Sequence, residues 1–439
     1  MLQKHYQLFY NKQINPFWKW NTAFYLTTGK GYYEEYKAGV DFEDYKIDII
    51  GKVNVPSDLV RRRWLDNQFY GQIAAVSYQD KINDITLGGA WSIYDGLHFG
   101  TLPYLPITLA PSNYKYYDND ATKKEASSYI KWERKLNTQL SSFIDLQYRT
   151  VHHQMNGFTK NTDLIIGRKF NFFNPKMGIS YQTKNILYFA SVAVANKEPI
   201  RDDFEASINE QPKSERLIDW EAGLEYKKSK YAFNANFYFM DYTDQLVLTG
   251  KINDVGAYTR TNTPKSYRAG AEFQIKYAYS KKVNTTYSVS FSQNKIKAFT
   301  EYVDDYDENT QVAIQHKNTT IALSPSIISN RTFNWNPTDK LSLYWTTKYI
   351  SKQYLDNTQN ESRILDAYFL NDINAHWTVL NKSKYKMLLQ FYINNLLDVQ
   401  YEPNGYTYSY IYDRTTITSN NYYPMAGRNF WLSLKIDLK

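Results

Sequence analysis

The stretch that decides the fold is MLLQFYIN, residues 387–394, together with the final segment FWLSLKIDL, residues 430–438. The apolar side chains of the two segments fall at alternate positions, namely Met387, Leu389, Phe391 and Ile393 in the first and Phe430, Leu432, Leu434, Ile436 and Leu438 in the second. This alternation is typical of β-strands with one apolar and one polar face. A soluble sandwich would pack such apolar faces against a second sheet. A transmembrane barrel would turn them toward lipid and keep the polar faces inside.

The same alternation recurs along the chain and predicts about seventeen strands. They are expected at His5–Asn11, Trp18–Thr28, Phe69–Gln79, Ile85–Tyr94, Ala126–Lys135, Leu140–Val151, Asn174–Gln182, Leu187–Ala195, Leu217–Lys227, Tyr231–Asp241, Tyr267–Tyr279, Val283–Lys295, Ile321–Asn334, Leu341–Ser351, Ala367–Val379, Lys386–Leu397 and Phe430–Leu438. One face stays polar in strand after strand. The sequence therefore predicts an all-β protein.

The connections between these strands alternate between short and long. Turns such as QTKN at 182–185 and KKSK at 227–230 are short, whereas the connections at 95–124 and 399–428 are long. An up-and-down barrel with short periplasmic turns on one rim and long outside loops on the other produces this rhythm. We therefore predict an antiparallel up-and-down transmembrane β-barrel in which every long connection lies outside.

An odd number of strands predicts that the barrel is partial. Bacterial single-chain barrels have an even number of strands, and a barrel cannot leave an open edge in lipid. We therefore expect residues 1–439 to be one barrel domain, truncated at its N-terminal side. The N-terminus MLQKHYQLFY lacks the apolar core and cleavage site of a signal peptide, so we expect the chain to be either mature or missing its beginning.

Composition narrows the class of protein further. The chain has 42 Tyr, 23 Phe and 10 Trp, and amphipathic rings in such number suit two membrane–water interfaces. No apolar run approaches the roughly 18 to 20 residues of a membrane-spanning helix. The net charge of +8 is scattered over turns rather than gathered on one helix, so we expect no nucleic-acid partner. Without cysteine, disulfides and thiolate metal sites are excluded.

The sequence offers no catalytic or metal-binding motif. His152 and His153 are the only neighbouring histidines, and neighbours on a strand point to opposite faces. No Gly-x-Ser-x-Gly or His-Glu-x-x-His motif occurs. The acidic tip at 301–308 lacks the spacing of a calcium-binding loop. We therefore expect no enzyme activity, no metal and no cofactor.

Longer phrases of the sequence resemble one family. They include FASVAVANKEPIRDDF at 189–204, KSERLIDWEAGLEY at 213–226, INNLLDVQYEPNGYTY at 393–408 and YYPMAGRNFWLSLKIDLK at 422–439. In their order over nearly the whole length, they resemble the barrel domain of TonB-dependent outer-membrane receptors, most closely those of Bacteroidetes-type Gram-negative bacteria. The closing phrase is similar to the family's Pro-x-x-Gly-Arg turn before the last strand.

The resemblance implies an active transporter in the outer membrane of a Gram-negative bacterium. Such a receptor is a 22-stranded barrel plugged by an N-terminal domain, and it imports a scarce nutrient such as a ferric siderophore, a cobalamin-like cofactor or a glycan fragment. The seventeen strands would be its last seventeen. The expected partners are outer-membrane lipid, a small nutrient ligand, the TonB complex through the missing plug region, and the barrel-assembly machinery through the C-terminal strand. The family commonly ends in an aromatic residue, whose place Leu438 would take.

Aromatic outside loops are the candidate substrate site. The candidate residues are Tyr32, Tyr33, Tyr36, His98, Tyr406, Tyr408, Tyr410 and Tyr412. Rings at a pocket mouth can stack on a planar ligand or a sugar with little loss of entropy. Alternatively, these rings belong to the outer aromatic girdle or to packing between loops. Arg61, Arg62 and Arg63 would meet an anionic siderophore or a lipopolysaccharide phosphate, or form a charge ladder in the lumen.

Two other functions remain open at this point. A soluble or surface-exposed β-rich carbohydrate-binding protein would behave well in plain buffer, whereas a protein with a lipid-facing surface needs detergent. A passive porin would conduct without an energy source. The lipid-facing assignment of Phe430, Leu432, Leu434, Ile436 and Leu438 separates the barrel from the soluble alternative.

Overall fold

The computed structural model describes residues 2–47, 57–104, 114–158, 163–206, 211–252 and 258–438. Contacts divide the chain into two compact units. The first unit comprises Met1–Lys135, Phe143–Lys176 and Ile200–Gln211, and the second comprises Leu136–Ser142, Met177–Pro199 and Pro212–Lys439. The described residues form 22 strands, one short 3-10 helix and one short α-helix. Among them, no helix is long and apolar enough to cross a lipid bilayer.

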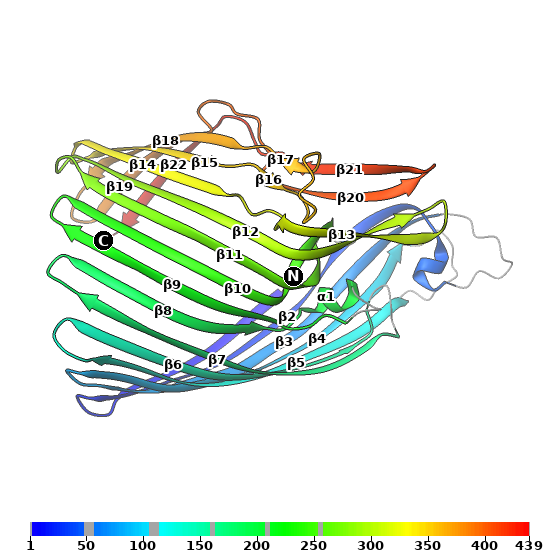
Figure 1. Ribbon diagram of the computed structural model, residues 1–439, viewed down its shortest axis with the longest axis horizontal. Helices are drawn as coiled ribbons and strands as arrows, with labels where there is room; N and C mark the ends of the chain where they lie inside the picture. The colour runs from blue at the N-terminus through cyan, green and yellow to red at the C-terminus, as the bar shows by residue number, and fades with distance from the viewer. Residues whose placement is uncertain are drawn as a thin grey trace. The chain divides into compact units, whose positions relative to one another are not determined.

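The first unit is built on an antiparallel meander of long strands, which run side by side in Figure 1. Its strands are β1 (Leu2–Gln13), β2 (Trp18–Val40), β3 (Ser57–Gln79), β4 (Asn83–Tyr104), β5 (Lys115–Lys135) and most of β6 (Leu140–Asn156) and β7 (Ile165–Gln182). Its helices are η1 (Phe42–Tyr45) and α1 (Arg201–Ala206). Each strand hydrogen-bonds to its neighbour in the sequence, which is the up-and-down order expected from the alternating connections.

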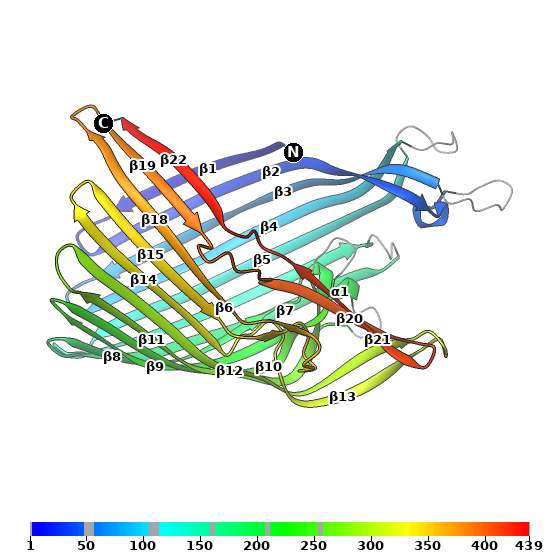
Figure 2. The ribbon, with the colours of Figure 1, turned by 90° about the horizontal axis from the view of Figure 1, so that it is seen from above.

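The second unit continues with antiparallel neighbours. Its long strands are β8 (Ile186–Lys197), β9 (Glu215–Lys228), β10 (Tyr231–Ile252), β11 (Tyr258–Ala278), β12 (Val283–Asp305), β14 (Ile327–Thr338), β15 (Leu341–Ile350), β18 (Tyr368–Asn381), β19 (Tyr385–Asn394) and β22 (Asn429–Leu438). Figure 2 shows β14, β15, β18 and β19 side by side, and β22 pairs with β19. Each of the seventeen predicted strands is present, although β14 begins at Ile327 rather than at Ile321.

Five further strands lie in connections that the sequence predicted as loops. They are β13 (Thr310–Thr320), β16 (Gln353–Tyr354), β17 (Ile364–Leu365), β20 (Asn404–Tyr412) and β21 (Thr415–Tyr423). The long connection predicted at 399–428 is present, between β19 and β22, but it contains regular structure that the sequence did not predict. Its middle is a hairpin of β20 and β21, and β20 also pairs in parallel with the end of β12. Backbone N–H and C=O groups need hydrogen-bond partners also where the chain leaves the main sheet, and a local hairpin supplies them within the connection.

The short turns are closed by side chains placed directly after a strand. Asp80 Oδ1 accepts hydrogen bonds from the backbone N–H groups of Ile82 and Asn83, at 2.7 and 2.6 Å. Asn137 and Ser280 accept in the same manner in the turns that follow β5 and β11. These Asx and Ser turns mimic a backbone turn. The two N–H groups, together with Tyr78, hold the pKa of Asp80 below its usual range.

Most long strands carry apolar side chains on one face and polar side chains on the other, as the alternation predicts. In the second unit, Phe237 and Phe239 of β10 are 52% and 44% exposed, and they alternate with Asn236 and Tyr238. In the first unit, Leu87 and Trp91 of β4 are 60% and 41% exposed. Monomeric soluble proteins rarely expose contiguous apolar patches of more than a few hundred Å². The described residues contain only small buried clusters, which lie near the strand ends that carry the long connections.

Candidate functional site

The polar face of the first unit is lined by paired charges. Arg149 of β6 makes a bidentate contact with Glu125 of β5, with Nε 2.7 Å from Oε1 and Nη2 3.0 Å from Oε2. Lys123 lies 3.7 Å from the same carboxylate. One strand further, Asn174 donates to Gln147 at 3.0 Å. This face carries polar side chains in hydrogen-bonding register, which suits a wetted interior.

The polar face of the second unit contains an open hollow of about 390 Å³. Its walls are two cross-strand rows of polar residues, the first formed by Glu225, Asn234, Gln274 and Ser288 and the second by Asn236, Glu272 and Ser290. Phe189 closes one side and Ile328 the other. The hollow offers carboxylate, amide and hydroxyl groups without a positive charge, so it fits a polar neutral surface better than an anion.

The strand β2 splits the tyrosines that the sequence predicted as one cluster. Tyr32 and Tyr36 lie on one face and Tyr33 on the other, because all three are inside a strand that pairs with β3 as far as Val40. The Tyr32 ring contacts Trp64 at 4.5 Å, and the Arg62 guanidinium lies over it at 4.5 Å. Their expected place in a loop is therefore wrong, since the hairpin stays hydrogen-bonded far beyond the roughly ten residues that span a membrane.

The three consecutive arginines divide in the same manner. Arg62 binds Glu34 at 2.7 Å on one face. Arg61 binds Glu35 at 2.8 Å on the other, and its side chain is only 11% exposed. Lys37 and Arg61 hold the pKa of Glu35 below its usual value. The arginines thus do not form one anion-binding group, and two of them are ion-paired within the chain.

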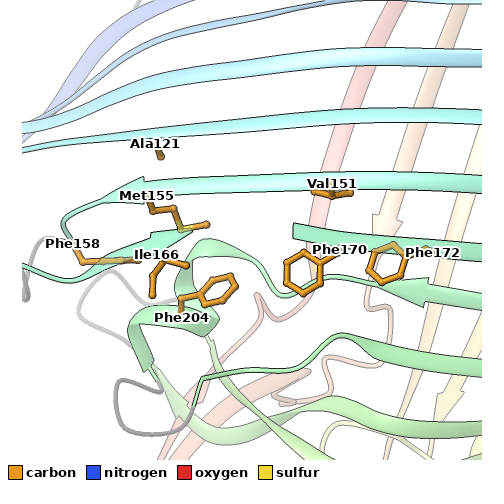
Figure 3. Packing of buried hydrophobic residues seen from close by; sticks show 8 residues of the cluster. All are labelled: Ala121, Val151, Met155, Phe158, Ile166, Phe170, Phe172 and Phe204. Carbon is orange, nitrogen blue, oxygen red and sulfur yellow. The ribbon is translucent and has the colours of Figure 1, made fainter. Parts of the chain in front are cut away.

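A cluster of buried side chains covers part of the polar face of the first unit, near the strand ends that carry the long connections (Figure 3). It comprises Ala121, Val151, Met155, Phe158, Ile166, Phe170, Phe172 and Phe204. Phe204 comes from helix α1 and is fully buried. The Arg201 guanidinium lies 4.4 Å over the ring of Phe158, and its Nη2 donates to the carbonyl of Gly157 at 2.7 Å. This cluster fastens α1 to β6 and β7.

His98 lies within β4 rather than in the predicted outside loop. Burial, with a smaller contribution from the charge of Arg201, lowers its pKa to about 4. The imidazole is therefore neutral at pH 7. His152 is exposed and His153 is 5% exposed, as expected for strand neighbours on opposite faces. Among the residues that the structure describes, no group of three or more acidic or histidine side chains is arranged to hold a metal ion.

A buried ionic network joins three long connections of the second unit. Arg363 Nη1 lies 2.6 Å from both Glu301 Oε1 and Asp356 Oδ2, and its Nη2 donates to Ser409 at 2.8 Å. Glu301 also contacts His316 at 2.9 Å. Burial lowers the pKa of Arg363, but its two carboxylate partners raise it overall. The network holds the β20–β21 hairpin and the 351–367 connection against the β12–β13 hairpin.

The four alternating tyrosines of the last long connection lie on one face of β20, opposite this network. Tyr408 and Tyr412 are 42% and 59% exposed, whereas Thr407 and Ser409 on the other face are 2% and 6% exposed. Tyr408 and Tyr410 stack at 6.4 Å. Tyr406 contacts Tyr423 at 6.0 Å. The structure therefore brings these four predicted residues together on one face of one strand.

Sequence reasoning missed the residues that fasten the long connections. Arg363 and Asp356 lie in a polar stretch without strand alternation, and Glu301, the second carboxylate that Arg363 binds, lies more than 50 residues away in the chain. Arg201 lies within residues 189–204, which resemble the family, but the resemblance implies no role for this arginine. The sequence offers one indication that the long connections are packed, namely that they contain isolated charged residues together with Leu and Phe.

Comparison with known proteins identifies the family. A model of the TonB dependent receptor-like, beta-barrel family matches residues 3–396, and the chain belongs to this family. No match was found among the curated proteins.

Among solved structures, the chain is similar to the ferric-catecholate import receptor Fiu from E. coli, with 13% identity and a TM-score of 0.66 over 99% of this chain and 63% of that one. The siderophore receptor PiuA from Acinetobacter baumannii gives 13% and 0.70, over 98% and 64%. The copper transporter OprC gives 13% and 0.71, over 98% and 64%. At this identity the likeness concerns the fold, and the chain spans less than two thirds of the length of these structures.

Proposed function

We propose that this chain forms part of the β-barrel wall of a TonB-dependent outer-membrane receptor that imports a scarce nutrient. The observation that carries the proposal is the separation of faces. Large apolar side chains stay exposed on one face of strand after strand, while the other face carries paired charges, amides and hydroxyls. Lipid on one side and water on the other is the environment in which both faces are stable.

The location and partners follow from the same faces. The outer membrane of a Gram-negative bacterium supplies the lipid, and Phe430, Leu432, Leu434, Ile436 and Leu438 on one face of β22 would face it. They are 61%, 70%, 54%, 54% and 85% exposed. The β22 strand would also be the segment that the barrel-assembly machinery recognises. The soluble carbohydrate-binding alternative is not favoured, because it leaves this apolar surface in water.

Energy coupling would depend on a plug domain. The strands β1 to β22 would form the later part of the barrel domain of a Bacteroidetes-type receptor, and contact with the TonB complex would run through a plug and its preceding segment. The 390 Å³ hollow on the second unit, with its uncharged and acidic walls, would accept polar plug residues.

The substrate would be a small ligand met at the outer strand ends. Similar structures are a ferric-catecholate receptor, a siderophore receptor and a copper transporter, so iron complexed by a siderophore is the first substrate to test. Tyr406, Tyr408, Tyr410 and Tyr412 would supply rings for stacking. Since the Arg363 network positions β20, it would control the geometry of these rings.

Growth on ferric siderophores tests the proposal. A strain that carries the complete receptor as its only iron importer is grown on single siderophores, with and without a protonophore that collapses the energy supply. We expect uptake that the protonophore abolishes, and uptake reduced at least several-fold by Tyr408→Ala plus Tyr412→Ala but not by Thr416→Ala on the same hairpin. Uptake that continues with the protonophore would identify a passive porin instead. Clean behaviour of the purified chain without detergent would contradict the membrane location.

A further inference from the structure

Two buried nitrogen donors in the first unit have no hydrogen-bond acceptor. They are Nη1 of Arg201, at the start of α1, and Nδ2 of Asn119 on β5. Both atoms are inaccessible to solvent, and neither has a partner within the described ranges. Asn119 is 3% exposed as a whole residue. Because buried donors in native proteins are almost always satisfied, each orphaned donor needs an explanation.

Both donors border the same buried cluster. Arg201 lies over Phe158 at 4.4 Å, and Phe158 packs in the cluster that contains Ala121 of β5. Asn119 is two residues before Ala121, so both side chains leave the same face of β5. Asn119 is also in register with His98 of β4. The cluster therefore connects Arg201, through Phe158, to the part of β5 that carries Ala121 and Asn119.

The charges around Arg201 agree with this placement. The positive charge of Arg201 lowers the pKa of His98 on β4, and Tyr94 on β4 and Tyr117 on β5 raise the pKa of Arg201 electrostatically. His98 lies opposite Asn119 in the pairing of β4 with β5, and Tyr117 is two residues before Asn119 on β5. Burial lowers the pKa of Arg201, and Glu205 and Asp202 offset only part of that effect. Since burial keeps His98 neutral at pH 7, it adds no second positive charge.

An oxygen acceptor with negative charge resolves both orphaned donors. A buried donor without a hydrogen-bond acceptor lowers the stability of the fold by about 1–3 kcal/mol, and by more when the group is charged. A guanidinium forms its strongest hydrogen bonds with carboxylate or phosphate oxygens, in a planar fork. An amide N–H₂ beside it adds a neutral donor of fixed direction. A cation or an apolar ligand would leave both donors unpaired.

We propose that Arg201 and Asn119 form an oxyanion-binding site on the polar face of the first unit, beside helix α1. The ligand class is a small carboxylate or phosphate. The oxyanion would bridge α1 to β5 and so stabilise the connection that holds α1 against the sheet. This inference goes beyond nutrient import and does not depend on it, because it concerns the purified chain and its own donors.

Anion titration of the purified chain in detergent tests the site. Sodium citrate and inorganic phosphate are added separately at constant ionic strength, with sodium chloride as the reference, and binding is followed by calorimetry and by the thermal unfolding midpoint. We expect saturable binding of at least one of the two, which also distinguishes a carboxylate from a phosphate ligand. Absence of saturable binding of either anion, which would mean that water alone fills the site, overturns the proposal.

Three variants make the test specific. Arg201→Gln is expected to weaken binding at least tenfold. Arg168→Gln is the matched control, since its guanidinium also lies over a phenylalanine of the cluster, Phe170, at 6.0 Å, and it should bind as the wild type does. Asn119→Asp places a carboxylate of the chain next to Arg201, so it should abolish anion binding while leaving the fold intact and the unfolding midpoint at or above that of the wild type. An equal loss in Arg168→Gln, or unchanged binding in Asn119→Asp, contradicts the proposal.

Discussion

Replacing Leu434 by arginine tests the central physical claim, that one face of each strand is stable only against lipid. Leu434 lies near the middle of β22, is 54% exposed, and is in register with Leu389 of β19. Its neighbour Ser433 points to the opposite face, in register with Gln390. The two positions differ in the face they occupy but hardly in depth, so Ser433→Arg is a matched control.

The length of β22 sets the magnitude. The strand has 10 residues, which at about 3.3 Å per residue gives roughly 33 Å. A tilt of about 45° reduces its height to roughly 23 Å, close to the apolar band of about 25 Å. With the apolar face of β22 against lipid, as proposed, Leu434 would lie near the midplane, where an arginine on the lipid face costs about 2–4 kcal/mol. On the water-filled side, the arginine stays solvated, and substitutions at solvated surface positions usually change stability by no more than about 0.5 kcal/mol.

Equilibrium unfolding in lipid vesicles measures both variants. Leu434→Arg should lower the free energy of unfolding by about 2–4 kcal/mol, which is a roughly 30- to 700-fold change in the folding equilibrium constant. Ser433→Arg should change it little. Equal costs for the two variants, or a tolerated arginine at Leu434, would refute the assignment of the faces and with it the membrane location.

Three further predictions concern single contacts. Arg363→Met leaves the buried carboxylates of Asp356 and Glu301 without their partner, so it should lower the local stability by about 3–5 kcal/mol. Amide hydrogen exchange should then become faster throughout β20 and β21. Unchanged exchange would show that the network does not hold the hairpin. Gly71→Ala places a Cβ against the carbonyl oxygen of Trp91, closer than van der Waals contact allows, so it should lower stability in thermal unfolding by about 1–3 kcal/mol. A neutral result would mean that the strands can shift apart. Burial lowers the pKa of His98 to about 4 in the folded chain, from 6.5 for the free side chain, so the unfolded chain binds more protons between these two pH values. The free energy of unfolding should therefore fall by up to roughly 3 kcal/mol as the pH drops from about 6.5 to about 4. His98→Gln should flatten this part of the plot of stability against pH, and an unchanged pH profile would contradict the burial of His98.

The alternation of side chains allowed most of the strand order to be predicted from the sequence. Ile144, Leu146 and Tyr148 are exposed on the face of β6 opposite Arg149, which binds Glu125. A strand between lipid and water needs a strict period of two, so each residue reports its own face without knowledge of its neighbours. The candidate site was less predictable. Only the tyrosines of β20 are gathered as expected, because they too alternate within one strand.

The sequence by itself determined the class of fold, the number of long strands, the rhythm of short and long connections and the family. Only the tertiary structure decided what the long connections do: that β2 continues as a strand and separates Tyr32 from Tyr33, that Arg363 joins Glu301 to Asp356, and that Arg201 reaches the cluster beside Asn119. The physical reason is range. Strand faces follow from a local repeat imposed by the solvent on each side, whereas contacts between connections join residues tens of positions apart and leave no period in the sequence.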